Sequence, residues 1–255
     1  MGNTLGKSAA IDFGIQWSCW IVASLLKTEK FYDLAGSGTA VLLTALSLHW
    51  NQEKIFHQKI QSGMVIAWGL RLGLFLFTRV LKAGKDRRFN NVRDHPLRFF
   101  VYWTIQGIWL MAILLPTLIL NSKTGDQPLT IKEYTGWSLW GIGFLLEALA
   151  DHQKTRFHNN PENQGKFITS GLWSIVRHPN YLGEILLWSG LYVSASSYLS
   201  GWERASVISP VLTALLLTKV SGIPLLEKSG MRRWGEDPQY LKYLKETPKL
   251  IPFLW

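Results

Sequence analysis

Cysteine is almost absent from this chain, and acidic residues are few. Of 255 residues only Cys19 is a cysteine, which excludes a disulfide-stapled scaffold and a zinc site built from cysteines. Asp and Glu number 17 against 27 Lys and Arg, and charged residues are 17% of the chain, where about a quarter is usual. Because hydrophobic residues make up 47%, the composition argues against a disordered chain and against an ordinary soluble domain.

Several common cofactor and catalytic signatures are also missing. The sequence has no P-loop, no Gly-x-Gly-x-x-Gly and no His-Glu-x-x-His. It has no serine nucleophile elbow either. The 6 His residues show no evident metal spacing, so we predict no metal site. An enzyme with this sequence would not use one of the common soluble cofactor designs.

Long apolar blocks alternate with charged loops. A membrane-spanning helix needs about 20 mostly apolar residues, and Phe99–Leu120 has that length without a charged residue. So many all-round apolar segments cannot be covered in a soluble domain of this size. We therefore predict an all-α, polytopic membrane helical bundle with about seven transmembrane helices, or six if the first only lies on the surface: Ile11–Leu26, Gly36–Trp50, Ile60–Lys82, Phe99–Leu120, Tyr134–Ala150, Tyr181–Trp202 and Ala205–Thr218, the last extendable to Leu226.

The basic residues predict the direction of the bundle. If the N-terminus is outside or lumenal, most Lys and Arg fall in cytosolic segments, namely 27–35, 82–98, 151–180 and everything from 219 onward. We expect a multi-pass integral membrane protein with a cytosolic C-terminus, in the endoplasmic reticulum of a eukaryote or the inner membrane of a bacterium. The net charge of +10 then reflects topology and not nucleic-acid binding. The expected partners are the lipid bilayer and a hydrophobic lipid or steroid-like substrate, and the oligomeric state stays open.

The first cytosolic loop, 82–98, mixes Arg and Lys with Asp86 and Asp94. A basic segment beside a membrane is typical of an anchor for anionic lipid, but a basic lid over a polyanionic cofactor has the same composition. The alternation of Asp with Arg predicts an ordered loop that is paired internally.

The segment 171–188 carries the clearest candidate site. Pro179 suits the first turn of a helix, which places Arg177 and His178 at the helix mouth, where an anion such as phosphate is favoured. Asn180 and Glu184 are four residues apart and share one helix face. Gly183 between them would let a ligand or a neighbouring helix approach closely.

Glu147 and Asp151, also four apart, end the preceding apolar segment. Ionisable groups inside a membrane are costly and are functional candidates by default. The alternative is that Glu147 and Glu184 pair with Arg or Lys and lock helices together.

The C-terminal segment predicts a short helix that begins at Pro238 and carries Tyr240 and Tyr243 on one face. Such a face either packs on the membrane surface or brings its hydroxyl groups to a cofactor.

The string GLWSIVRHPNYLGEILLW at 171–188, with GKDRRF at 84–89 and FYDLAGS at 31–37, resembles the DUF1295 membrane family of unknown function. The C-terminal half of that family is similar to steroid 5-alpha-reductases and to sterol C14 reductases, which share an Arg-His-x-Asn-Tyr-x-Gly-Asp pattern. The resemblance implies one membrane domain over 1–255, with N-terminal helices at 1–135 on the substrate side and a cofactor-binding part at 136–255. It implies NADPH as the cofactor and reduction of a carbon–carbon double bond in a lipid.

The resemblance also implies roles for individual residues. Asn180, Tyr181 and Glu184 would contact the nicotinamide half. The remaining cofactor-binding candidates fall in three places. Arg177 and His178 precede Pro179, Asp151 and Arg156 lie in the 151–180 segment, and Glu227, Tyr240 and Tyr243 lie in the C-terminal segment. Ile251-Pro252-Phe253 ends the family pattern. No residue matches the catalytic acid of the steroid enzymes, so the catalytic residues stay unknown.

Membrane methyltransferases of the isoprenylcysteine and phospholipid type are similar too, because they share Arg-His-Pro-x-Tyr-x-Gly. In that alternative S-adenosylmethionine occupies the same pocket, and Glu227 holds the adenosyl moiety. A third alternative is a non-catalytic membrane protein that binds lipid.

Overall fold

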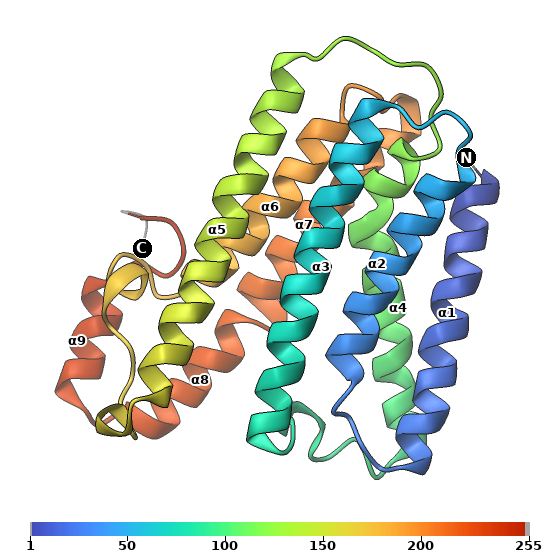
Figure 1. Ribbon diagram of the computed structural model, residues 1–255. Coiled ribbons are helices and arrows are strands. Elements are labelled where there is room, and N and C mark those ends of the chain that lie inside the picture. Colours follow the sequence, from blue (N-terminus) through green and yellow to red (C-terminus); the bar gives the residue numbers. More distant parts are fainter. Residues whose placement is uncertain (1, 253–255) are drawn as a thin grey trace. The chain divides into compact units, whose positions relative to one another are not determined.

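The computed structural model describes residues 2–252, and every regular element in that range is a helix, which confirms the predicted all-α class (Figure 1). The chain divides into two compact units. The first unit runs to Glu133 and includes Ser194–Ser209. The second unit holds Tyr134–Val193 and the chain from Pro210 onward.

The helices of the first unit are α1 (Gly2–Leu25), α2 (Tyr32–Trp50), α3 (Phe56–Ala83) and α4 (Pro96–Leu120), with the 3-10 helix η4 (Gly201–Val207). The second unit holds most of α5 (Ile131–Asn159) and α6 (Pro179–Ala195), most of α7 (Ile208–Leu215), the π-helical turn η5 (Leu216–Val220), α8 (Ile223–Trp234) and α9 (Pro238–Glu246).

Three segments of the described chain are long and apolar enough to cross a membrane: Phe56–Ala83, Pro96–Leu120 and Gly201–Trp234. They fit a membrane protein. The four other expected spans are helical over most of their length but are not among these three, so a count of seven transmembrane helices stays a prediction.

Two of the expected spans differ from the helices found. The expected span Tyr181–Trp202 is interrupted, because α6 ends at Ala195 and a 3-10 helix starts after Ser200. The carboxylate of Glu203 accepts the Ser200 N–H at 2.8 Å, which caps that new helix. The expected span from Ala205 is likewise divided by the π-helical turn before α8.

Helix α4 forms the core of the first unit. The side chains of Phe99, Trp103, Leu110 and Leu114 are fully buried, as are those of the residues near its C-terminus. Pro96 stands in its first turn, where a missing N–H costs nothing. Helix α4 packs against α1, and α2 packs against α3.

The basic loop before α4 is ordered and paired, as the alternation of Asp with Arg predicts. Arg88 Nη2 lies 2.6 Å from Asp86 within the loop and 2.5 Å from Asp33 on α2. Arg93 pairs with the buried Glu29 at 3.1 Å. These pairs tie the loop to the start of α2, which favours a structural role for its charges.

Helices α5 and α6 approach each other at glycines. A Cβ atom on Gly143 would lie 2.5 Å from the carbonyl oxygen of Gly183 and 2.7 Å from the Leu187 nitrogen. Gly190 faces Gly136 in the same way, one heptad further along each helix. The pairing order makes the two helices antiparallel, and Figure 1 shows them side by side. Small residues permit this backbone contact, which a side chain would block.

We expect Gly143→Ala to destabilise the second unit by about 1–3 kcal/mol, the usual cost of overpacking, because the new methyl group meets α6 backbone. The matched control is Gly141→Ala on the same helix, where nothing lies within 4 Å. That change should be neutral or stabilising, since Ala favours a helix over Gly by about 1 kcal/mol. Thermal unfolding of the two purified variants checks this, and equal melting temperatures would contradict the close approach.

Candidate functional site

The α5–α6 contact brings two of the expected polar residues together. Asn180, in the first turn of α6, donates its side-chain amide to Asp151 on α5 at 3.2 Å. Pro179 begins α6, as predicted, and Asp151 is buried. The structure therefore places the start of α6 beside the C-terminal part of α5.

Glu227 on α8 joins the loop before α6 to the C-terminal segment. Its Oε1 lies 2.7 Å from Arg177 Nη1 and 3.7 Å from His178 Nε2, and its Oε2 lies 3.7 Å from Lys249 Nζ. The Arg177 N–H also donates to the Pro248 carbonyl at 2.8 Å. The side chain of Arg177 is only 9% exposed, so its charge depends on this carboxylate.

His178 is buried beside that ion pair and stacks on Tyr181, with ring centroids 5.6 Å apart. Neither ring nitrogen has a hydrogen-bond partner within the described residues, and the same holds for Arg177 Nε. Burial lowers the pKa of His178, and Lys154 and Arg177 lower it further against the opposing effect of Glu227. The imidazole is therefore held neutral, with one nitrogen free to donate to a ligand.

A cavity of about 180 Å³ opens beside these residues. Three cations contribute to its wall, Lys154, Arg177 and Arg233, against the single carboxylate of Glu227. Aromatic side chains form much of the remaining wall: Phe167, Trp173, Trp234, Tyr240 and Tyr243. Such a lining suits an anion attached to a planar ring.

Hydrogen bonds hold the aromatic wall in place. The Tyr243 hydroxyl donates to the Trp173 carbonyl at 2.6 Å, and the Trp173 indole donates to the Ala150 carbonyl at 3.1 Å. Tyr240 fits against Gly230, where a Cβ atom would collide with the phenol. Burial raises the pKa of both tyrosines, so both keep their protons. Their hydroxyl groups therefore act as neutral donors or acceptors.

Of the ten predicted cofactor-binding residues, five line this cavity: Arg177, His178, Glu227, Tyr240 and Tyr243. Asp151, Asn180 and Tyr181 lie next to them through the contacts above. Glu184 is buried and accepts the Trp188 indole N–H at 2.8 Å. Arg156 is exposed and is not part of the lining.

Sequence reasoning did not single out most of the lining, including Lys154, Trp173 and Arg233. Lys154 lies over the Trp173 ring, with its Nζ 4.6 Å from the ring centroid. It stands two residues before Arg156, the residue that the sequence predicted as a cofactor contact. Residues i and i+3 share a face of a helix, so the position of Asp151 indicates Lys154 as a further candidate. Phe253, the last residue of the expected tail pattern, lies outside the described residues.

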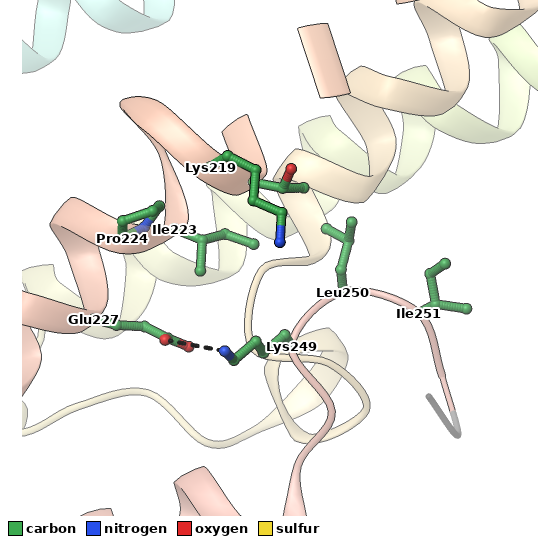
Figure 2. A pocket seen from close by; sticks show the side chains of 8 residues that line it. Lys219, Ile223, Pro224, Glu227, Lys249, Leu250 and Ile251 are labelled. Atoms are coloured by element: carbon green, nitrogen blue, oxygen red, sulfur yellow. Dashed lines mark ion pairs between the residues drawn. The ribbon is translucent and has the colours of Figure 1, made fainter. Parts of the chain in front are cut away.

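A second cavity, of about 420 Å³, also has Glu227 in its wall (Figure 2). Small-molecule sites usually measure roughly 300–1,000 Å³, so the first cavity alone is too small for a dinucleotide. The buried, unpartnered donors of Arg177 and His178 fit the phosphate groups of such a cofactor. A whole dinucleotide would need to extend beyond the first cavity toward the surface.

The chain belongs to the DUF1295 family, described as proteins of unknown function, whose sequence profile matches residues 19–247. This confirms the expected membership. No solved structure matches the chain.

Curated relatives of two chemical classes match. A probable O-methyltransferase (ustE) of Ustilaginoidea virens is 29% identical over 121 residues, 44% of this chain and 43% of the relative. The 3-oxo-5-alpha-steroid 4-dehydrogenase 1 of Bos taurus is 35% identical over 71 residues, 28% of this chain and 27% of the relative. The Delta(14)-sterol reductase of Arabidopsis thaliana is 28% identical over 99 residues, 33% of this chain and 23% of the relative. The chain spans less than half the length of these three relatives.

The neutral, buried state of His178 predicts an acid-sensitive fold. In the unfolded chain this His has a pKa of about 6.5, and in the folded chain its pKa is lower. Below about pH 6.5 the unfolded state therefore binds more protons, so stability falls as the pH falls and is fully present above that value. We expect the melting temperature of His178→Gln to fall less than that of the wild type when the pH is lowered from about 7.5 to about 5.5.

The control for that comparison is His152→Gln, because His152 is exposed on α5. It should show the pH slope of the wild type. If His178→Gln kept the wild-type slope as well, the buried neutral imidazole would be refuted.

Proposed function

We propose that this protein is a membrane-embedded, NADPH-dependent oxidoreductase that reduces a carbon–carbon double bond of a steroid-like or other lipid substrate. The observation that carries the proposal is the cationic, aromatic cavity around Arg177, in which three cations face one carboxylate. The similarity to a steroid dehydrogenase and a sterol reductase supports the reaction class.

In this proposal the cavity residues divide the work of holding the cofactor. Lys154, Arg177 and Arg233 neutralise its phosphates, because charge-assisted hydrogen bonds are strong where water is excluded. Glu227 keeps Arg177 oriented when no ligand is present. The neutral His178 adds a donor without adding charge. The bound NADPH supplies the hydride, and the protein supplies orientation and electrostatics.

Asp151 and Asn180 serve as positioning residues in the same proposal. Their mutual hydrogen bond fixes both side chains at the start of α6, where they would orient the cofactor. Tyr181 and Glu184 follow on the same helix, and the resemblance assigns them to the nicotinamide half.

We further propose a multi-pass topology of about seven spans with a cytosolic C-terminal side. A hydrophobic substrate then reaches the N-terminal helices at 1–135 from the lipid, while a charged dinucleotide reaches the part at 136–255 from the water. The basic residues of the 151–180 loop and the tail support this direction.

A second candidate is an S-adenosylmethionine-dependent lipid or isoprenylcysteine-type methyltransferase. The similarity to a probable O-methyltransferase favours it, since that match covers 44% of this chain. Glu227 would hold the adenosyl moiety. In this candidate Glu227 would share its carboxylate between the ligand and Arg177, with which it pairs at 2.7 Å.

Thermal unfolding with separate cofactors tests both candidates. We expect saturating NADPH to raise the melting temperature of the detergent-purified protein, because a ligand at about 100 times its dissociation constant stabilises by roughly 2.7 kcal/mol. NADH and S-adenosylmethionine should have smaller effects. A shift with S-adenosylmethionine alone would overturn the reductase in favour of the methyltransferase.

A pair of adjacent arginines makes the test specific for the cavity. Both side chains are exposed, but only Arg233 lines the cavity. We expect Arg233→Gln to weaken NADPH binding about tenfold, the loss of one charge-assisted hydrogen bond. Arg232→Gln should bind as the wild type does. Equal weakening in both variants would mean that only general surface charge attracts the cofactor.

A further inference from the structure

The second cavity lies where the C-terminal apolar segment changes direction (Figure 2). Its volume of about 420 Å³ falls within the usual range of small-molecule sites. It is formed by the π-helical turn η5, the start of α8 and the chain after α9. Apart from Glu227, none of its lining residues was used in the proposed function.

The cavity owes its shape to a break in the helix. After α7 the chain forms the π-helical turn Leu216–Val220, and α8 restarts at Ile223 with Pro224 in its first turn. Gly222 makes the break possible, because a Cβ atom there would collide with the backbone of Leu217. Turns of this kind are frequent at functional sites. The break leaves the Lys219 side chain pointing into the cavity (Figure 2).

Positive charge exceeds negative charge in the wall of this cavity. Lys219 and Lys249 supply two cations, and Lys219 forms no ion pair within the described chain. The one carboxylate, Glu227, is already engaged by Arg177 at 2.7 Å and by Lys249 at 3.7 Å. The N-terminus of the 12-residue helix α8 adds the positive end of its dipole. An anion would therefore be stabilised here.

The rest of the wall is largely apolar. Ile223 is buried, and Pro224, Leu250 and the half-exposed Ile251 also line the cavity. A free inorganic anion would gain nothing from these side chains, whereas a hydrocarbon chain would bury apolar surface against them at about 25 cal/mol per Å². The combination selects a molecule with an anionic head and an apolar body.

We propose that this cavity binds the phosphate monoester headgroup of an anionic membrane lipid, with Lys219 and Lys249 on the phosphate and Ile223, Leu250 and Ile251 on the chains. The site goes beyond the proposed reductase, whose cofactor cavity shares Glu227 and no other lining residue with this one among the described residues. It also goes beyond simple snorkelling of lysines to the membrane surface, which would show no preference for one particular lysine.

Titration calorimetry of the full-length protein in neutral detergent tests this site. The probes are dioctanoyl phosphatidic acid, dioctanoyl phosphatidylcholine and inorganic phosphate. We expect phosphatidic acid to bind at least about tenfold more tightly than either of the others, and Lys219→Gln to weaken it about tenfold. Lys219→Arg, which keeps the charge, should restore binding. The matched control is Lys228→Gln on α8, because Lys228 is exposed and lies outside both cavities.

Four results would overturn the proposal. Equal affinity for phosphatidylcholine would show that the site does not recognise an anionic headgroup. Equal affinity for inorganic phosphate would show that the lipid chains do not contribute to binding. Unchanged binding in Lys219→Gln would exclude the cavity, and an equal loss in Lys228→Gln would reduce the effect to surface charge. None of these results bears on NADPH, so a failure here is distinguishable from a failure of the reductase.

Discussion

The backbone contact between α5 and α6 is the constraint on which the candidate site depends. Gly143 meets Gly183, and Gly136 meets Gly190 seven residues further on, so the two antiparallel helices are held in one register. That register sets Asp151 opposite Asn180 at 3.2 Å. A slip by one helical turn would move the polar residues of α6 about 5.4 Å along α5 and separate the pair. Packing therefore decides which polar groups meet.

Glu227 holds the charged residues of the site in place, as the glycine contact holds the two helices. Burying Arg177 alone would be costly, and a pair of buried ions rarely repays its desolvation unless further hydrogen bonds complete it. Here Lys249 Nζ lies 3.7 Å from the same carboxylate, and the Arg177 backbone N–H donates to the Pro248 carbonyl at 2.8 Å. The ion pair thus closes the tail over the loop before α6. Glu227 also lines two cavities of different character, one with an aromatic wall and one with an aliphatic wall.

Local rules predicted the parts of this site that depend on local structure. Pro179 and Pro238 each begin a helix, because a proline in the first turn loses no hydrogen bond. Lys154 lines the cavity and Arg156 does not, because this wall is set by a distant partner, Trp173, which sequence spacing alone does not show. The π-helical turn was missed for the same reason: it depends on Gly222 fitting against Leu217, and the run of apolar residues continues unbroken through it.

The charge balance of the first cavity separates the two cofactors that the relatives suggest. Lys154, Arg177 and Arg233 carry three positive charges against one negative charge. A dinucleotide with several phosphates would restore neutrality, and each phosphate contact would be strengthened by the low dielectric of the cavity. S-adenosylmethionine carries no excess negative charge, so it would gain less from the cationic lining. The charge of the lining therefore favours the anionic cofactor.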